Sequence, residues 1–424
     1  MRLVGRIFFS CILSGPLVGL CRSAREEMRS FSCMRGGLRD DLCAARISAL
    51  NSHAETKCAE EACFGGKIRR SRTRRAHKRP RGAELWGHGM GDTAELHAAM
   101  RAKKDEFYTQ RVDIENELRH YKPHFKGKVV LCNCDDPRQS EFFNYFVANF
   151  EKLGLKRLIA TCYKSQDVDL FSQGECERAI YQIYDGDKNG NMTLDDDEVC
   201  VRELKGDGDF RSAECIEILK QSDIVVTNPP FSLFREYVSQ LIKYDKKFLI
   251  IGNVNAITYK EVFPPFKQNL IWLGASIHSG DRKFGVPENY PLNAAACGVD
   301  ENGQRYIRVK GVRWFTNLDY PQRHEKLPLY KSYSPDEFPK YDNYDAINVD
   351  KTADIPYDYD GVMGVPITFM DKYSPEQFEI VGITNHGEMA GIPFKNGNCF
   401  AEVGGQRKYV RILIRHRKEE EKKL

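Results

Sequence analysis

Residues 228–231, Asn-Pro-Pro-Phe, have the types and the order that chemistry on a planar amine requires. They follow the apolar run Ile224–Val226, which predicts a buried strand that ends at Asn228, because proline cannot continue a sheet. The two prolines hold an extended turn and leave the carbonyls of Asn228 and Pro229 free to accept hydrogen bonds. The Asn228 amide adds an acceptor, and Phe231 offers an aromatic face for a flat ring. An ordinary loop followed by a core phenylalanine would read the same way, so neighbouring segments must decide.

Length and composition bound the class of protein. The 424 residues are enough for two domains, or for one domain with a large extension, and a hydrophobic content of 41% supports a sizeable core. The net charge of +4 permits a polyanionic partner without demanding one. Six of the fourteen cysteines lie in the first ninety residues, and the others lack the paired CxxC spacing of a zinc site. We expect Cys132 and Cys134 to share one face of a strand in a reducing compartment.

Residues 1–89 differ from the rest of the chain. Met1–Cys21 resembles a signal peptide but is too short and too interrupted for a transmembrane helix. Lys67–Arg81 is a dense basic run, which suits either a nucleic-acid-binding arm or a disordered tail. With no periodic apolar pattern, we expect 1–89 to be a disordered, basic, cysteine-containing extension. A start codon assigned too early would explain it, with Met90 as the natural start.

A strand, a turn, a helix and a second strand follow one another after residue 126. The predicted elements are the strand Lys126–Cys134, the turn Asp135–Arg138, the helix Glu141–Leu153 between Ser140 and Gly154, and the strand Lys156–Tyr163. Such a unit favours parallel strands, with ligands bound beyond their carboxyl ends, where Asp135 and Asp136 lie. The turn lacks the GxGxxG pattern, so a nicotinamide dinucleotide site is not supported. It suits a ligand that carries ammonium and hydroxyl groups.

Two further segments set aromatic residues beside polar ones. Ala94–Tyr121 is helical in pattern and holds the pair Phe107 and Tyr108 near a polar helix start. Lys205–Arg211 contains Gly-Asp-Gly-Asp-Phe, which suits either contact with a purine or an ordinary Gly/Asp turn. The remaining predicted elements of this half are the helices Ser212–Gln221 and Leu233–Tyr244 and the strands Phe248–Ile251 and Ile271–Leu273.

The segment from Asp185 to Asp196 matches a calcium-binding EF-hand loop. Asp185, Asp187 and Asn189 stand at its first, third and fifth positions, and Gly190 at its sixth. Its twelfth position is Asp196 where bidentate Glu is usual, and its flanks suit hairpin strands better than helices. We therefore favour a solvated turn without metal.

Four motifs, in this order, resemble those of the EcoRI-type adenine-specific DNA methyltransferases. They are Lys104–Thr109, Cys132–Arg138, Gly206–Ser212 and Val225–Arg235, and Gly364–Tyr373 also resembles that family's C-terminal portion. The similarity runs from Met90 to Arg417. It implies an α/β, Rossmann-like fold with a mainly parallel twisted sheet that binds S-adenosylmethionine, at residues 90–290. It also implies an α+β target-recognition region with a basic tail at 291–424.

The resemblance implies transfer of a methyl group from S-adenosylmethionine to N6 of an adenine flipped out of duplex DNA. Asn228 and the carbonyl of Pro229 would accept the two hydrogens of the amine and direct its lone pair at the methyl group. Phe231 would stack on the base, with Pro230 completing the catalytic motif. Positioning would do most of the work, since the sulfonium is already reactive.

Three segments would hold the cofactor. Phe107, Tyr108 and Thr109 would close over its methionine end, Cys134, Asp135 and Asp136 would lie against its methionine or ribose, and Asp207, Asp209 and Phe210 would bind its adenine. One departure from the family is that Thr161–Lys164 carries no immediate acid for the ribose hydroxyls. Asp167, Asp169 or the Asp135–Asp136 turn would have to serve.

The C-terminal third leaves two alternatives open. Lys310–Thr316 is both basic and aromatic, which suits a DNA-contacting surface or a buried strand with Trp314 in the core. Lys331–Asp360 predicts a long loop, and Arg407–Lys422 a basic tail that is either solvated or touches phosphate.

We expect a cytoplasmic, nucleoid-associated monomer with double-stranded DNA as substrate and no membrane association, which acts either alone or paired with a cognate restriction endonuclease. Two other functions remain open from the residues. One is methyl transfer to RNA or to a protein glutamine by the same fold, because Asn-Pro-Pro-Phe suits any planar amine or amide. The other is nucleic-acid binding without catalysis.

Overall fold

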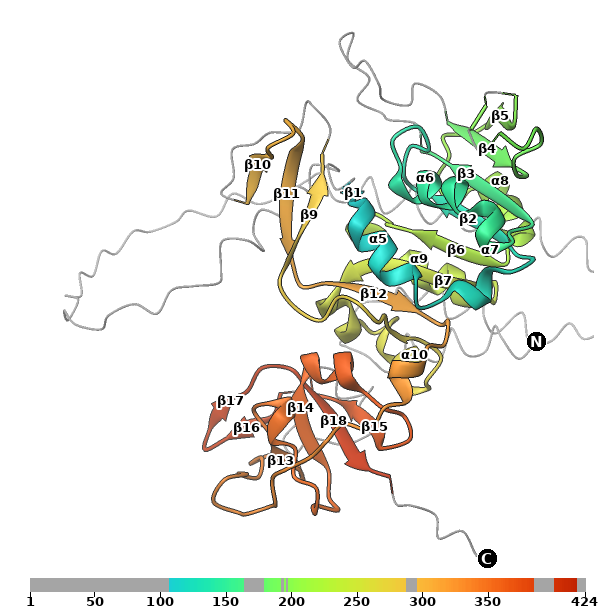
Figure 1. Ribbon diagram of the computed structural model, residues 1–424. Helices are drawn as coiled ribbons and strands as arrows, with labels where there is room; N and C mark the ends of the chain where they lie inside the picture. Colours follow the sequence, from blue (N-terminus) through green and yellow to red (C-terminus); the bar gives the residue numbers. More distant parts are fainter. Residues whose placement is uncertain are drawn as a thin grey trace, which may run out of the picture. The chain divides into compact units, whose positions relative to one another are not determined.

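The computed structural model describes residues 107–163, 179–191, 194–195, 197–286, 296–384 and 400–417, which all belong to one compact unit of the chain (Figure 1). The predicted extension at 1–89, the acids Asp167 and Asp169, and Asp196 lie outside the described residues. Within the described part, no helix is long and apolar enough to cross a membrane.

The largest sheet is mixed, with a parallel centre and antiparallel edges. Its strands lie in the order β5-β4-β3-β2-β6-β7-β12-β8. The parallel strands are β3 (Arg157–Thr161), β2 (Val129–Asn133), β6 (Ile224–Thr227) and β7 (Lys247–Asn253). The antiparallel strands are β5 (Val199–Glu203), β4 (Ile180–Tyr184), β12 (Val312–Thr316) and β8 (Trp272–Leu273). The prediction of a mainly parallel sheet is therefore wrong at both edges, where antiparallel strands flank the parallel centre.

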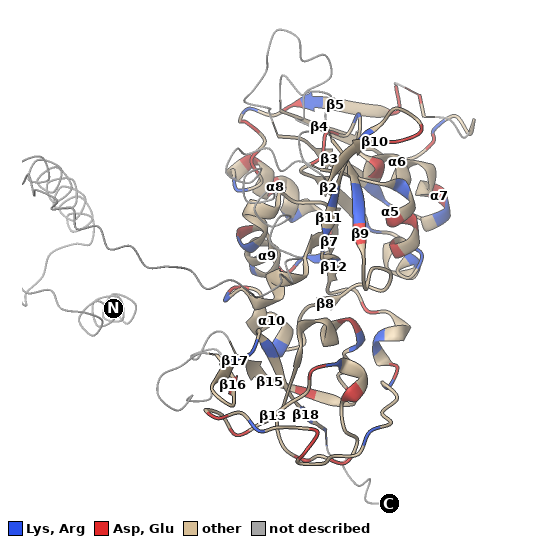
Figure 2. Ribbon diagram, turned by 90° about the vertical axis from the view of Figure 1, so that its left-hand side faces the viewer, with Lys and Arg blue, Asp and Glu red and all other residues tan. Residues whose placement is uncertain are grey.

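Helices cover both faces of this sheet (Figure 2). α5 (Arg111–Leu118), α6 (Glu141–Ala148) and α7 (Phe150–Leu153) pack on one face, and α8 (Ala213–Gln221) and α9 (Phe234–Lys243) on the other. β2 serves both layers, because Leu131 belongs to the core beneath α8 and α9 whereas Val130 belongs to the core beneath α5 and α6. The chain therefore forms a three-layer α/β arrangement with both sheet faces buried.

A small sheet stands beside the large one. Its four strands are β1 (Tyr108–Thr109), β9 (Asp281–Gly285), β11 (Arg305–Lys310) and β10 (Cys297–Val299), all antiparallel neighbours in that order. Gly311, at φ +71°, turns the chain from β11 directly into β12 of the large sheet. The predicted boundary after residue 290 thus falls between β9 and β10, and β12 on its far side completes the large sheet.

The C-terminal residues form a third sheet. Its strands are β13 (Ile347–Asn348), β14 (Met363–Pro366), β18 (Arg411–His416) and β15 (Phe378–Ile383), with the hairpin β16 (Glu402–Val403) and β17 (Gln406–Arg407) beside them. Short helices connect these parts: α10 (Phe263–Lys267), η5 (Val254–Thr258), η6 (Pro321–His324), η7 (Thr352–Asp354) and η8 (Ile367–Lys372). The prediction of a basic tail from Arg407 is wrong as far as Arg417, because β18 is a central strand with Ile412–Ile414 fully buried.

The structure decides the alternative left open for Lys310–Thr316. Every residue of β12 is buried, and Trp314 packs edge-on against Phe142 at a centroid distance of 6.0 Å. Arg313 in the same strand is turned inward and pairs with Asp371. From Val312 to Thr316 the segment is a core strand whose aromatic side chains fill the interior, whereas Lys310 ends β11 and is exposed.

Three local predictions are also wrong. Phe107–Thr109 lies outside a helix: β1 pairs with β9, and α5 begins only at Arg111. The predicted helix Glu141–Leu153 breaks at Asn149, whose side chain donates to the carbonyl of Tyr145 and competes with the helix ladder. Cys132 and Cys134 do not share a face, because β2 ends at Asn133 and Cys134 takes a left-handed conformation at φ 80°.

Candidate functional site

Asn228 stands directly after β6, in the middle of the large sheet. β6 lies between β2 and β7, and all its residues are buried. The side-chain nitrogen Nδ2 of Asn228 donates to the carbonyl of Phe107 at 2.6 Å. The side-chain oxygen Oδ1 is buried too, and no described residue donates to it. An unsatisfied buried acceptor costs roughly 1–3 kcal/mol, so this oxygen is a group that a donor from a ligand would satisfy.

The residues after Asn228 form a rigid turn. Pro230 is extended, at φ −53° and ψ 128°, and its carbonyl accepts from the backbone of Leu233, which closes the short helix η4 (Phe231–Leu233). Phe231 makes edge contacts with Phe107 and Phe284 at centroid distances of 6.0 and 6.5 Å. Its ring is therefore held by core packing while it stays next to the Asn228 amide.

A cavity of about 200 Å³, called here the inner cavity, lies at the carboxyl ends of β2, β3 and β6. Its walls come from four separate stretches of chain: the turn after β2, the residue Tyr163 after β3, the Gly-Asp-Gly-Asp-Phe loop, and the residues after Asn228. Cys134, Asp209, Phe210 and Pro230 all line it. Three of the four motifs, Cys132–Arg138, Gly206–Ser212 and Val225–Arg235, therefore meet beyond the carboxyl ends of the parallel strands, where the sequence predicted a ligand site.

Gly208 allows the loop to come this close. Its φ of +81° is unfavourable for a side chain, and a Cβ there would lie 2.3 Å from the carbonyl oxygen of Cys162. Cys134 faces the same cavity with φ 80°, a conformation that residues other than glycine rarely adopt. Unusual backbone on two sides of one cavity is typical of a functional site.

Phe210 is fixed from three directions. Its ring packs edge-on against Tyr237 at a centroid distance of 5.0 Å, and the guanidinium of Arg211 lies over it at 5.4 Å. Its carbonyl accepts from the Gln240 side chain at 2.9 Å. Tyr237 in turn donates its hydroxyl hydrogen to the side chain of Asn133. Phe210 is therefore a preorganised aromatic wall.

The two acids of this loop have different places. Asp209 lines the inner cavity, and its carboxylate accepts two bonds from the Arg211 guanidinium, at 2.9 and 2.6 Å, and one from the Arg211 backbone nitrogen at 2.8 Å. These bonds from Arg211 lower the pKa of Asp209, so the carboxylate is ionised at neutral pH. Asp207 lies outside the lining and accepts from the backbone of Asp209 at 3.0 Å. The contact of Asp207 is therefore that of an ordinary Gly/Asp turn, in which the side chain bonds to the backbone two residues later.

Asp135 and Asp136 also lie outside the lining of the inner cavity. Asp136 is buried and accepts from the backbone nitrogen and the guanidinium of Arg138, at 2.7 to 3.2 Å. Asp135 accepts from the hydroxyl of Ser140 at 3.4 Å. The bonds of both acids close the turn that presents Cys134 to the cavity.

Phe107, Tyr108 and Thr109 lie beside the motif Asn228–Phe231, and the lining of the inner cavity does not include them. Phe107 touches the motif through its carbonyl and its ring. Thr109 is buried, and its hydroxyl has no partner among the described residues.

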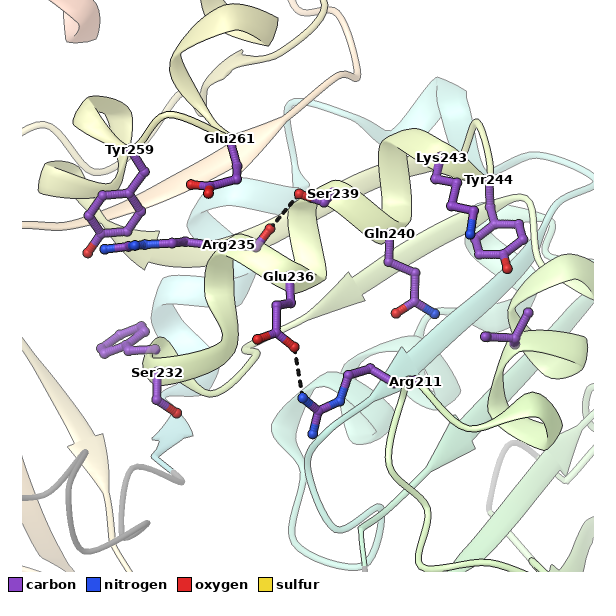
Figure 3. Close-up of a pocket in the computed structure, with 12 residues that line it drawn as sticks. Arg211, Ser232, Arg235, Glu236, Ser239, Gln240, Lys243, Tyr244, Tyr259 and Glu261 are labelled. Carbon is purple, nitrogen blue, oxygen red and sulfur yellow. Dashed lines mark hydrogen bonds and ion pairs between the residues drawn. The ribbon is translucent and has the colours of Figure 1, made fainter. Parts of the chain in front are cut away.

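An outer groove of about 670 Å³ starts at Phe231 and Ser232 and follows the exposed side of α9 (Figure 3). Arg235 stacks on Tyr259 with 4.0 Å between guanidinium and ring centroid. Arg211 bonds to Glu236 at 2.8 Å across the groove. Arg211 and Ser232 line both the groove and the inner cavity, so the two spaces adjoin.

Several residues of the site were not singled out from the sequence. Arg211 and Asn133 lie within the motifs Gly206–Ser212 and Cys132–Arg138 but were assigned no role, whereas Tyr163 and Tyr237 lie outside the motifs. Tyr237 could have been found from the sequence, because it lies on the apolar side of the helix that follows the Asn-Pro-Pro-Phe turn. A tyrosine hydroxyl on such a buried side needs a hydrogen-bond partner nearby.

The EF-hand-like segment forms the connection between β4 and β5. Asp185 pairs with Arg157 at 2.6 Å, and Asp187 accepts from the backbone of Asn189 and Gly190. Antiparallel strands flank the segment, as predicted. Within the described residues, no group of three or more His, Cys, Asp or Glu could hold a metal ion.

Comparison with known proteins decides the family. A family model described as "Adenine-specific methyltransferase EcoRI" matches residues 95–417. The Escherichia coli protein "Type II methyltransferase M.EcoRI" is 53% identical over 325 residues, which cover 76% of this chain and 96% of the relative. The chain belongs to the EcoRI family of adenine-specific methyltransferases.

Two mycoplasma relatives extend the family. "Type II methyltransferase M.MgeORF184P" of Mycoplasma genitalium is 38% identical over 332 residues, and "Type II methyltransferase M.MpnI" of Mycoplasma pneumoniae is 38% identical over 334. Each match covers 76% of this chain and 98% of the relative. No solved structure matches the chain.

Family membership confirms the predicted resemblance and the predicted enzyme class. An adenine-specific methyltransferase excludes the alternatives of a protein glutamine as acceptor and of a non-catalytic binding protein. The matched range contains all four motifs and excludes residues 1–94.

Proposed function

We propose that this chain transfers a methyl group from S-adenosylmethionine to N6 of an adenine flipped out of duplex DNA. One observation carries the proposal: the buried Asn228 Oδ1, which no described residue satisfies, next to a cavity with an aromatic wall. An exocyclic amine is the donor that such an oxygen lacks. A paired adenine cannot reach a buried amide, so the base must leave the stack.

The residues of the motif would act together on the amine. One hydrogen of N6 would bond to Asn228 Oδ1, and the other to the carbonyl of Pro229. Both bonds draw electron density toward the nitrogen and fix the direction of its lone pair. Phe231 would hold the ring plane, and N6 would release one proton to water after the new bond forms. The bond from Asn228 Nδ2 to the Phe107 carbonyl keeps Oδ1, instead of Nδ2, facing the amine.

The inner cavity fits the adenosine part of the cofactor. Phe210 offers a fixed ring for stacking, and the ionised Asp209 an acceptor for an amine. Asp207 would shape this loop, while Asp135 and Asp136 would shape the turn that holds Cys134 against the cofactor. When bound, S-adenosylmethionine supplies the methyl group as a reactive sulfonium. Phe107, Tyr108 and Thr109 would cover its methionine end.

The wider assignment follows from this function. We propose that the large sheet and its helices form the Rossmann-like, cofactor-binding part, and that the C-terminal sheet belongs to target recognition. The relatives are named type II methyltransferases, so a partner restriction endonuclease, with both proteins acting on cytoplasmic DNA, is part of the proposal.

Transfer of label from methyl-labelled S-adenosylmethionine tests the function. Unmethylated duplex DNA, duplex RNA and a protein mixture are offered separately, and the labelled DNA is digested to nucleosides. We expect label in DNA alone, as N6-methyladenine. Label in cytosine or in RNA, or the absence of label from DNA, would contradict the proposal.

A further inference from the structure

The small sheet has one face turned toward the core and one turned away from it. Phe284, Ile307 and Val309 are buried on the inward face. The alternate residues of the same strands, Lys283 and Arg308, are exposed on the outward face. The outward face is defined here by Lys283, Tyr306, Arg308 and Lys310, and it carries one acid, Asp281, which is the register partner of Lys310. Figure 2 shows the basic residues of β9 and β11 close together.

Two like charges lie directly opposite each other on this face. Lys283 on β9 is the register partner of Arg308 on β11. Neither forms an ion pair with any residue that the structure describes. Like charges in this position destabilise a sheet, so this arrangement disfavours the free protein and favours a complex with an anion.

Tyr306 holds the two cations in place. The Lys283 ammonium lies 4.5 Å from the centre of its ring, and the Arg308 guanidinium lies 5.6 Å from it. The Arg308 guanidinium also donates to the Tyr306 hydroxyl at 3.4 Å. Two cations braced on one ring lose little further freedom when an anion binds.

The outward face is continuous with the catalytic motif. Tyr108 of β1 and Tyr306 of β11 are both register partners of Gly285 in β9, so these three residues form one row across the sheet. The residue before Tyr108 is Phe107, whose carbonyl holds the Asn228 amide. A polyanion on this face would therefore lie along the same strands that position the catalytic side chain.

We infer that the outward face binds the phosphate backbone of the duplex whose adenine is methylated. Lys283 and Arg308 contact phosphate oxygens, and Tyr306 sets their spacing. This inference rests on the proposed function. Phosphate contacts fix the register of a protein on its duplex without reading sequence, so this face positions the DNA while other residues select the site.

The salt dependence of DNA binding tests the inference. Each phosphate contact contributes about 0.9 to the slope of log affinity against log salt. The double variant Lys283→Gln/Arg308→Gln should lower that slope by about 2, for cognate and unrelated duplexes alike. Between about 50 and 200 mM salt, the variant should lose roughly tenfold less affinity than the wild type does. Binding of S-adenosylmethionine should not change, and the temperature of thermal unfolding should not fall, because the double variant removes a like-charge pair.

Two comparison variants show whether the change in salt dependence comes from the charges on the outward face or from the net charge of the protein. Lys152→Gln/Arg202→Gln removes the same charge from exposed positions on α7 and β5, where Arg202 also bonds to a tyrosine hydroxyl, and should keep the wild-type slope. Lys283→Arg/Arg308→Lys keeps the charge and should also keep the slope.

An unchanged slope in the double Gln variant, or an equal fall in the α7/β5 control, would overturn the inference. A fall that occurs with duplex RNA and not with duplex DNA would do the same. Wild-type methyl transfer is measured in parallel. If the wild type methylates duplex DNA and the slope is unchanged, only this inference fails, whereas no transfer by the wild type removes the proposed function itself.

Discussion

At the scale of single residues, the proposed function assigns the chemistry to one oxygen of the Asn228 side chain, the buried Oδ1. The variant Asn228→Ala removes the acceptor for the amine but leaves the inner cavity intact. We expect kcat to fall by about 10²–10³-fold, which is the cost of removing one preorganised hydrogen bond in a transition state. The dissociation constant for S-adenosylmethionine should stay within about twofold of the wild-type value, because cofactor and amide contacts are separate. Single-turnover kinetics with saturating cofactor measures the first quantity, and calorimetry the second.

A matched variant sharpens that prediction. Ser239 lines the outer groove, and among the described residues its hydroxyl bonds only to the carbonyl of Arg235 in its own helix, so Ser239→Ala is the control. It should keep near-normal turnover. Turnover of Asn228→Ala close to that of Ser239→Ala would rule out the assigned role of Asn228.

The residue types of this site were predictable from the sequence, but their orientation was not. Asn-Pro-Pro-Phe predicts a hydrogen-bond acceptor and an aromatic ring, because these groups are part of the residues themselves. Which end of the Asn228 amide faces the ligand depends on the carbonyl of Phe107, which is 121 positions away in the chain. The hydrogen bonds from Arg211 to Asp209 likewise depend on a side-chain conformation, which the spacing of residues in the sequence does not specify.

At the scale of elements, the Gly206–Phe210 loop can be tested with two glycines. Gly208→Ala would place a Cβ 2.3 Å from a backbone oxygen at φ +81°, so the loop must move. We expect it to destabilise the fold by roughly 1–3 kcal/mol and to weaken cofactor binding, because Asp209 and Phe210 move with the loop. Gly206→Ala, where a Cβ meets no atom within 4 Å, is the control. Equal effects of the two substitutions on urea unfolding and on cofactor affinity would disprove this view of the loop.

The central strands and helices were predictable because the apolar residues of each recur with one clear period along the sequence. β2 and β3 pair in parallel as expected, Gly154 ends α7 in a left-handed conformation, and Ser212 caps α8 by accepting from Cys215. β1 could not be found in the same way. Its two residues sit beside a helical pattern, and their strand pairing with β9 depends on residues more than 170 positions later. A strand that forms only through such a distant pairing shows no periodic pattern in its own sequence.

At the scale of the whole molecule, His324 links the segment after β12 to the C-terminal region. Its ring nitrogens lie 2.6 Å from Glu376 and 2.8 Å from Asp319. The hydrogen bond to Glu376, followed by that to Asp319, raises the pKa of His324. A raised folded-state pKa gives stability that is complete below the unfolded value of about 6.5 and is lost as pH rises through the folded value.

The measurement is urea unfolding of the wild type and of His324→Gln at about pH 6, below the unfolded value, and at about pH 8, above it. The wild type should be more stable by up to about 1 kcal/mol at the lower pH, since the pair is partly exposed. The advantage should shrink at the higher pH. An advantage that grows with pH would contradict the linkage.

The Arg313–Asp371 pair ties the large sheet to the C-terminal region more strongly, because both side chains are almost fully buried. Arg313 in β12 bonds to Asp371 in η8 at 2.6 and 2.9 Å, and its guanidinium also donates to the carbonyl of His278. Asp371→Asn leaves a buried charge without its counter-ion, and should cost about 3–5 kcal/mol of unfolding free energy. Arg313→Met/Asp371→Leu removes both charges, and should cost much less than the single variant.

An exposed pair in the same region provides the reference for that experiment. Arg415 and Glu379 join β18 to β15 at 2.7 Å, with both side chains nearly half exposed. Glu379→Gln should change stability by less than about 1 kcal/mol, because solvent screens such a pair. If Asp371→Asn cost no more than Glu379→Gln in urea unfolding, burial would not be what makes the link strong. The apolar core that the two regions share, with Phe266 and Phe315 on one side and Val365 and Phe378 on the other, would then be the main link between them.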